Sequence, residues 1–99
     1  MENCCKEQFK KNPRSEEDIQ NLKNRLNRIS GQINGVTKML DENRYCGDIL
    51  IQIAAIEKGL EAVGYLILEN HMKTCVKDDI LSGDDKTIDE ALDLMKKLK

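Results

Sequence analysis

The chain has 99 residues, a formal net charge of −2 and only three aromatic side chains. That length suits one small domain with a modest core, so we expect association with further copies to contribute to stability. A run of about 18 apolar residues is missing, which predicts no membrane span, and the first residues lack the apolar stretch of a secretory signal. We therefore expect a cytoplasmic protein whose four cysteines serve metal or redox chemistry rather than structural disulfides.

The small net charge conceals an uneven distribution along the chain. Residues 10–44 carry eight basic and five acidic side chains, whereas residues 45–99 carry seven basic and eleven acidic ones. The first part of the chain can therefore face an anionic partner although the chain as a whole is slightly acidic.

Residues 1–14 show no periodicity and end beside the only proline, so we predict a flexible N-terminal arm there. Residues 15–99 are predicted to form a single helical domain. Ser15 is followed by three acidic residues, which is typical of a helix start. Apolar residues then recur in steps of three and four, as in a helix that packs against another helix. They are Ile19, Leu22, Leu26, Ile29, Ile33, Val36 and Leu40.

A polar turn over residues 41–44 separates this helix from a second one. The second apolar series starts at Ile49 and continues to about Leu81, where a Ser-Gly-Asp-Asp turn ends it. A short third helix is predicted through Ile88 and Leu98. The fold class is therefore all-α. Two long helices and a short one make a small monomeric core, so at least a dimer is expected.

The single histidine, His71, stands four residues before Cys75. On a helix this spacing places both side chains on one face, where an imidazole and a thiolate can hold one metal ion. Cys46 lies at the start of the same helix, where backbone N–H groups favour the thiolate. About 25 residues separate it from the pair, or roughly 37 Å of helix, so Cys46 has to come from an antiparallel second subunit. Two thiolates and one imidazole suit Cu(I) or Zn(II).

Each of these residues also has an ordinary structural interpretation. Buried cysteine often behaves as a small hydrophobic residue, and a helical histidine is commonly a surface or capping residue. The spacing alone does not decide between the two interpretations. Motifs for phosphate binding or nucleophilic catalysis are missing, which argues against an enzyme, and so are helix-turn-helix and zinc-finger signatures.

Four segments together resemble the copper-sensing repressor family, which also contains nickel, formaldehyde and persulfide sensors. They are residues 25–32 (RLNRISGQ), 43–50 (NRYCGDIL), 52–55 (QIAA) and 69–76 (ENHMKTCV). The resemblance extends over about residues 16–98. It implies a three-helix protomer, with two long helices and one short, that forms an antiparallel dimer and a dimer-of-dimers tetramer. It also implies binding to operator double-stranded DNA.

The resemblance further implies the effector. Cys46, His71 and Cys75 fall on the Cys-His-Cys positions of the copper sensors, whose metal site is shared between subunits. The additional ligand position of the nickel sensors falls near Arg14, which cannot coordinate a metal. Persulfide sensors lack the histidine and formaldehyde sensors lack the second cysteine, so Cu(I) is the implied ligand.

Two further groups of residues follow from the resemblance. Tyr45 and Glu90 match residues that couple metal binding to DNA affinity in copper sensors. Arg25, Arg28 and Gln32 lie on one stripe of the first helix, the surface that the family uses for DNA. Basic residues of the arm extend this patch: Lys10, Lys11 and Arg14.

We therefore expect a copper(I)-responsive transcriptional repressor that binds operator DNA without metal and releases it on Cu(I) binding, which derepresses copper-resistance genes. The alternative is a repressor of the same fold in which Cys46 and Cys75 sense persulfide or other sulfur species by covalent bridging. Cys4 and Cys5 lie outside the matched region and keep a redox role open. A helical metal-storage protein is disfavoured, because storage bundles need many cysteines in the core and this core is aliphatic.

Overall fold

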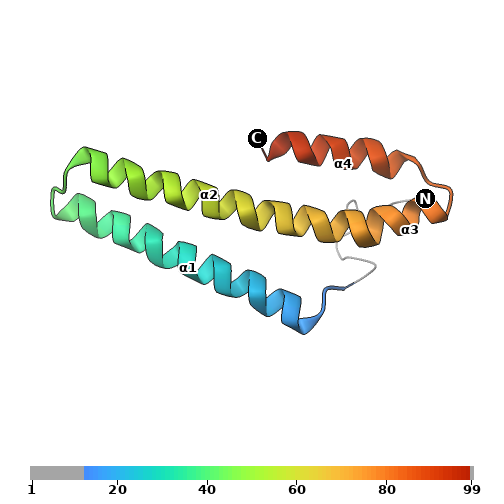
Figure 1. Cartoon of the computed structure of the whole chain (residues 1–99), viewed down its shortest axis with the longest axis horizontal. Helices are drawn as coiled ribbons and strands as arrows, with labels where there is room; N and C mark the ends of the chain where they lie inside the picture. The colour runs from blue at the N-terminus through green and yellow to red at the C-terminus, as the bar shows by residue number, and fades with distance from the viewer. Residues whose placement is uncertain (1–12, 99) are drawn as a thin grey trace. The chain divides into compact units, whose positions relative to one another are not determined.

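The computed structural model describes residues 13–98, which form helices joined by short turns (Figure 1). The chain divides into two compact units, one made of residues 15–63 and the other containing the chain from Gly64 onward. Most of the predicted arm, residues 1–14, lies outside the described residues. The structure describes only its last two residues, Pro13 and Arg14. The prediction of one helical domain over residues 15–99 stays a prediction.

Helix α1 (Glu16–Asp41) begins where the sequence predicted. The Ser15 hydroxyl accepts a hydrogen bond from the backbone N–H of Asp18 at 3.1 Å, which satisfies one of the free donors of the first turn. At the other end the N–H of Glu42 bonds back to carbonyls of the last turn. Asn43 then adopts a positive φ of 53°, a left-handed conformation that asparagine tolerates better than most residues. The predicted turn over residues 41–44 is confirmed.

The first unit is held together by apolar contacts between α1 and the first part of helix α2 (Cys46–His71). Ile29 of α1 is buried with Ile56 and Val63 of α2, and two further residues of the predicted series, Leu22 and Val36, pack against this cluster. These contacts bring together the two apolar series that the sequence predicted. Others of the series are exposed in the single chain, among them Leu26, Ile33, Leu40 and Leu60.

The second predicted helix continues without a break to Leu81, but it is not uniform. Helix α2 ends at His71, a π-helical segment η1 (Met72–Val76) follows, and helix α3 (Lys77–Leu81) completes the run. The predicted end is confirmed, because residues 82–83 form a turn in which Gly83 has a φ of 90° that favours glycine. The sequence pattern gave no sign of the π segment.

The second unit packs helix α4 (Lys86–Lys97) against η1. Ala91 of α4 is buried, and Leu98 lies against Gly64, where an added Cβ would meet a Leu98 methyl carbon at 2.6 Å. The absence of a side chain at Gly64 thus permits the close approach of the chain after α4. None of the helices within residues 13–98 is long and apolar enough to cross a membrane.

Candidate metal centre

His71 and Cys75 lie at the junction between α2 and η1. His71 is the last residue of α2, and Cys75 lies within η1. Both are buried, with exposed fractions of 6% and 2%. A π turn is wider than an α turn because its hydrogen bonds join residues five apart, so residues four apart stand more nearly in line along the axis. The local structure therefore favours two donor groups on one face of the same turn.

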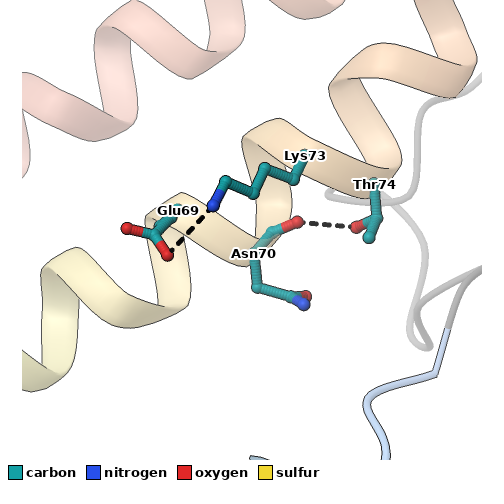
Figure 2. Close-up of polar contacts among 4 residues, drawn as sticks. All are labelled: Glu69, Asn70, Lys73 and Thr74. Carbon is teal, nitrogen blue, oxygen red and sulfur yellow. Dashed lines mark hydrogen bonds and ion pairs between the residues drawn. The ribbon is translucent and has the colours of Figure 1, made fainter.

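The side chain of Thr74 makes two polar contacts beside this pair. Its hydroxyl donates to the backbone carbonyl of Asn70 at 2.7 Å, and its oxygen lies 3.7 Å from the Sγ of Cys75 (Figure 2 shows the first of these contacts). An exposed ion pair between Lys73 and Glu69, at 3.4 Å, spans the same junction. Sequence reasoning did not single out Thr74; the only available signal was its place directly before Cys75.

The sulfur of Cys75 takes part in a disulfide bond in this structure, whereas Cys46 is a free, exposed thiol. Within residues 13–98, Cys46 and Cys75 are the two cysteines. Because the thiolate is the form of cysteine that binds metals, Cys75 has to be reduced before it can act as a ligand.

Cys46 is the first residue of α2 and follows Tyr45, whose side chain is exposed. The carbonyl of Tyr45 accepts hydrogen bonds from the N–H groups of Asp48 and Ile49 at 3.1 and 3.3 Å, which makes Tyr45 the residue that caps this helix. Its ring lies over Gly47, where an added Cβ would approach the ring carbon Cε2 to 2.6 Å. The glycine therefore leaves room for the ring at the start of the helix.

The three predicted ligands do not come together in the single chain. Cys46 begins α2 in the first unit, whereas His71 and Cys75 belong to the second. Within the part of the chain that the structure describes, no three His, Cys, Asp or Glu side chains lie close enough to hold a metal ion. The described residues of one chain therefore do not form a three-ligand site by themselves.

Glu90 lies on α4, the helix that packs against the π segment containing Cys75. It is half-buried, and its Oε1 is shielded from solvent. Two further polar residues of the second unit, Asp79 of α3 and Thr87 of α4, are also buried. Sequence reasoning missed both, since apolar periodicity marks polar residues at such positions as surface.

The predicted DNA-binding residues are described only in part. Arg25 and Arg28 are exposed on α1, and Gln32 is half-buried one turn further along. Arg14 is half-buried in the chain before α1. The remaining two, Lys10 and Lys11, lie outside the described residues.

Comparisons with known proteins point in one direction. Residues 18–97 match a family described as metal-sensitive transcriptional repressor. The chain is 42% identical over 87 residues to the copper-sensing transcriptional repressor CsoR of Bacillus subtilis, a match that covers 87% of this chain and 86% of that protein.

Two solved structures are also similar. One is the copper-sensing repressor CsoR with Cu(I) from Geobacillus thermodenitrificans, at 45% identity and a TM-score of 0.82, covering 87% of this chain and 91% of that one. The other is the nickel-responsive transcriptional regulator InrS, at 37% identity and a TM-score of 0.73, covering 89% and 100%. The similarity confirms the predicted all-α fold class.

Proposed function

Because the chain belongs to the family of metal-sensitive transcriptional repressors, we propose that it is a copper(I)-responsive repressor rather than an enzyme. Membership confirms the family resemblance inferred from the four sequence segments. The metal-free protein binds operator DNA, and Cu(I) binding releases it and derepresses copper-resistance genes. The identity of 42% to a copper-sensing relative supports this effector over nickel, for which Arg14 offers no ligand.

The observation that carries the proposal is the buried pair of His71 and Cys75 on one helical turn. Together with Cys46 they supply two thiolates and an imidazole, a donor set that suits Cu(I) and is poor for Mg²⁺ or Ca²⁺. Cys46 begins the helix that His71 ends, so one straight helix cannot bring these residues together. The third ligand is therefore Cys46 of a second subunit arranged antiparallel to the first.

Tyr45 and Glu90 support the metal ligands in this proposal. Tyr45 directly precedes Cys46 and is exposed in the single chain, so its phenol is accessible to a second subunit. Glu90 lies on the helix packed against η1, the segment of Cys75. Groups that surround a metal commonly orient its histidine ligand, and such contacts couple metal binding to the rest of the fold.

A second copy of the chain accounts for the apolar side chains that the single chain leaves in contact with solvent. Leu50 and Ile51, near the start of α2, are 63% and 67% exposed, and Leu81 at the end of α3 is also exposed. Large exposed apolar areas usually mark interaction surfaces. We place the antiparallel dimer, and the tetramer made from two such dimers, on these residues.

The DNA-binding surface is assigned to α1. Arg25 and Arg28 contact phosphates or bases, with Gln32 on the same stripe, and the arm adds Lys10, Lys11 and Arg14. The ion pairs of the described residues include neither Arg25 nor Arg28. The positive charges of both side chains are thus available to an anionic partner. Each phosphate contact increases the dependence of the affinity on salt concentration. A cytoplasmic location follows from this role.

A DNA mobility assay under anaerobic conditions tests the proposal, with operator fragments selected from a random DNA pool by the metal-free protein. We expect Cu(I) to release the DNA from the unaltered protein and from Lys73→Ala, a control that removes an exposed side chain next to the same turn. His71→Ala should retain the DNA in the presence of Cu(I). Zn(II) serves as a comparison of metal selectivity.

The same assay with polysulfide tests the alternative, sulfur sensing through Cys46 and Cys75. The exposed, free thiol of Cys46 is the observation in its favour, because an accessible thiol can react with sulfur species. Release by polysulfide but not by Cu(I), unchanged in His71→Ala, would replace the copper proposal with this one.

A further inference from the structure

Helix α4 has a second apolar face besides the one that packs within its own unit. Thr87 and Ala91 are the buried residues of this helix. Ile88, Leu92 and Met95 are 42%, 51% and 42% exposed in the single chain. Their steps of four and three place these three side chains on one stripe of the helix, which we call the α4 stripe. The stripe is therefore an apolar surface in contact with solvent.

The charged side chains beside the α4 stripe differ in sign from one end of the helix to the other. Asp89 lies in the first turn of α4 and Lys96 in its last turn. They are seven residues apart, so they lie along the same edge of the helix, about two turns from each other. Both are exposed, and the ion pairs of the described residues include neither. One edge of the stripe is thus acidic at its start and basic at its end.

This arrangement is complementary to itself when two copies of α4 run in opposite directions. In a pair related by a twofold axis across the helices, each edge of one helix meets the same edge of the other in reversed order. An axis beside Leu92 sets Ile88 of each copy opposite Met95 of the other. The same axis sets Asp89 opposite Lys96, because residue 92 lies near the middle of both pairs.

We propose that α4 pairs antiparallel with α4 of another copy of the chain through the α4 stripe. The pair has an apolar centre and a contact between opposite charges at each end. A parallel pair brings opposite edges of the two helices together, so that Asp89 does not meet Lys96. The charges therefore favour the antiparallel orientation as well as the choice of partner.

The α4 stripe is separate from the surface that completes the proposed metal site. That site brings Cys46, at the start of α2, to the His71–Cys75 pair of another subunit, whereas the stripe contains no proposed ligand. Two different twofold contacts on one chain generate a closed tetramer when their axes cross at right angles. In the proposed tetramer the α4 pair adds a contact between the two dimers, an assignment that rests on the proposed function for the dimers themselves.

The first test measures the assembly of the full-length, reduced protein by sedimentation equilibrium. We expect the unaltered protein to form a tetramer. Leu92→Asp should raise the tetramer–dimer dissociation constant at least a hundredfold (about 10² or more), because it removes apolar contacts and sets two carboxylates opposite each other. The resulting dimers should bind as much Cu(I) per chain as the unaltered protein in a chelator competition. Circular dichroism verifies that the variant is folded.

Charge reversal tests the orientation of the pair. Asp89→Lys and Lys96→Glu should each raise the same dissociation constant about tenfold, since each variant opposes like charges at both ends. A mixture of the two variants should regain the unaltered constant, because every contact of a mixed pair joins opposite charges. Asp93→Lys is the matched control on the polar side of α4 and should leave the constant unchanged.

Three outcomes would overturn the inference. They are an unaltered protein that stays a dimer at all concentrations, an Asp93→Lys effect equal to that of Asp89→Lys, and no recovery when the two charge variants are mixed. The charge variants also decide the question if Leu92→Asp fails to fold. If the variants behave as expected but Cu(I) does not release the DNA, the proposed function fails and the α4 pair stands.

Discussion

At the scale of single residues, the candidate site depends on side chains at one turn of helix. His71 distinguishes copper binding from sulfur chemistry, because covalent S–S formation needs no imidazole. Cys75 is common to the proposed copper site and to the sulfur alternative. Thr74 lies beside Cys75 and can rotate its hydroxyl between the Asn70 carbonyl and the sulfur.

Replacing Thr74 by valine should weaken Cu(I) binding without unfolding the protein. A hydrogen bond to a charged group contributes about 1.5 kcal/mol, so loss of the hydroxyl beside the Cys75 thiolate should lower Cu(I) affinity about tenfold. Chelator competition measures this change. Thr37→Val is the matched control, since the Thr37 hydroxyl donates to the Ile33 carbonyl in the same way but lies on α1. Equal affinities of the two variants would contradict a role for Thr74.

Tyr45→Phe should separate copper binding from DNA release. The phenol is exposed beside Cys46 and is not itself one of the proposed ligands, so Cu(I) affinity should change little. The ratio of DNA affinities without and with Cu(I) should fall about tenfold, within the usual 1–3 kcal/mol range of allosteric coupling. DNA titrations in both states measure that ratio. Tyr65→Phe, at a tyrosine in the second half of α2, serves as the control and should leave the ratio unchanged.

At the scale of elements, the helix boundaries follow from local chemistry. Ser15 caps α1 through its hydroxyl, and Gly83 provides the positive φ that the turn before α4 needs. The glycines inside α1 have a different environment, because an added Cβ at Gly31 would meet nothing within 4 Å in the single chain. We therefore expect glycine to stabilise the fold at position 83 and to destabilise the helix at position 31.

Alanine substitutions should reveal this difference in the free energy of unfolding. Gly83→Ala should destabilise the protein by about 1 kcal/mol, because alanine is strained at positive φ. Gly31→Ala should stabilise it by up to about 1 kcal/mol, the difference in helix propensity. Urea denaturation of both variants provides the comparison. A destabilised Gly31→Ala would indicate that another subunit approaches α1 at this glycine.

At the scale of the whole molecule, two observations on the described residues support the proposed second subunit. Its described residues contain no three-ligand cluster, and apolar residues at the start of α2 are exposed. An antiparallel second subunit would supply the third ligand and would also cover the exposed apolar residues. If each subunit contributes one Cys46 and one His71–Cys75 pair, as we propose, the two sites of such a dimer are equivalent.

Mixing two inactive variants tests whether the site is shared. Cys46→Ser and Cys75→Ser should each fail to bind Cu(I) in the three-ligand site. After unfolding and refolding together, random pairing should restore about one site in four, since half of the dimers are mixed and each has one intact site. Chelator competition counts the restored sites. No restoration, with refolding of the unaltered protein as control, would mean that all ligands come from one subunit.

Much of this protein follows from its sequence alone, because the responsible interactions are local. Apolar residues in alternating steps of three and four predicted α1 and the long helical run to Leu81. Ser15 marked the start of the first helix. The spacing of four residues predicted that His71 and Cys75 share one helix face. Only the tertiary structure revealed the π segment, the burial of Asp79 and Thr87, and the disulfide bond of Cys75. The burial depends on contacts between separate helices, to which the periodicity within one helix is insensitive.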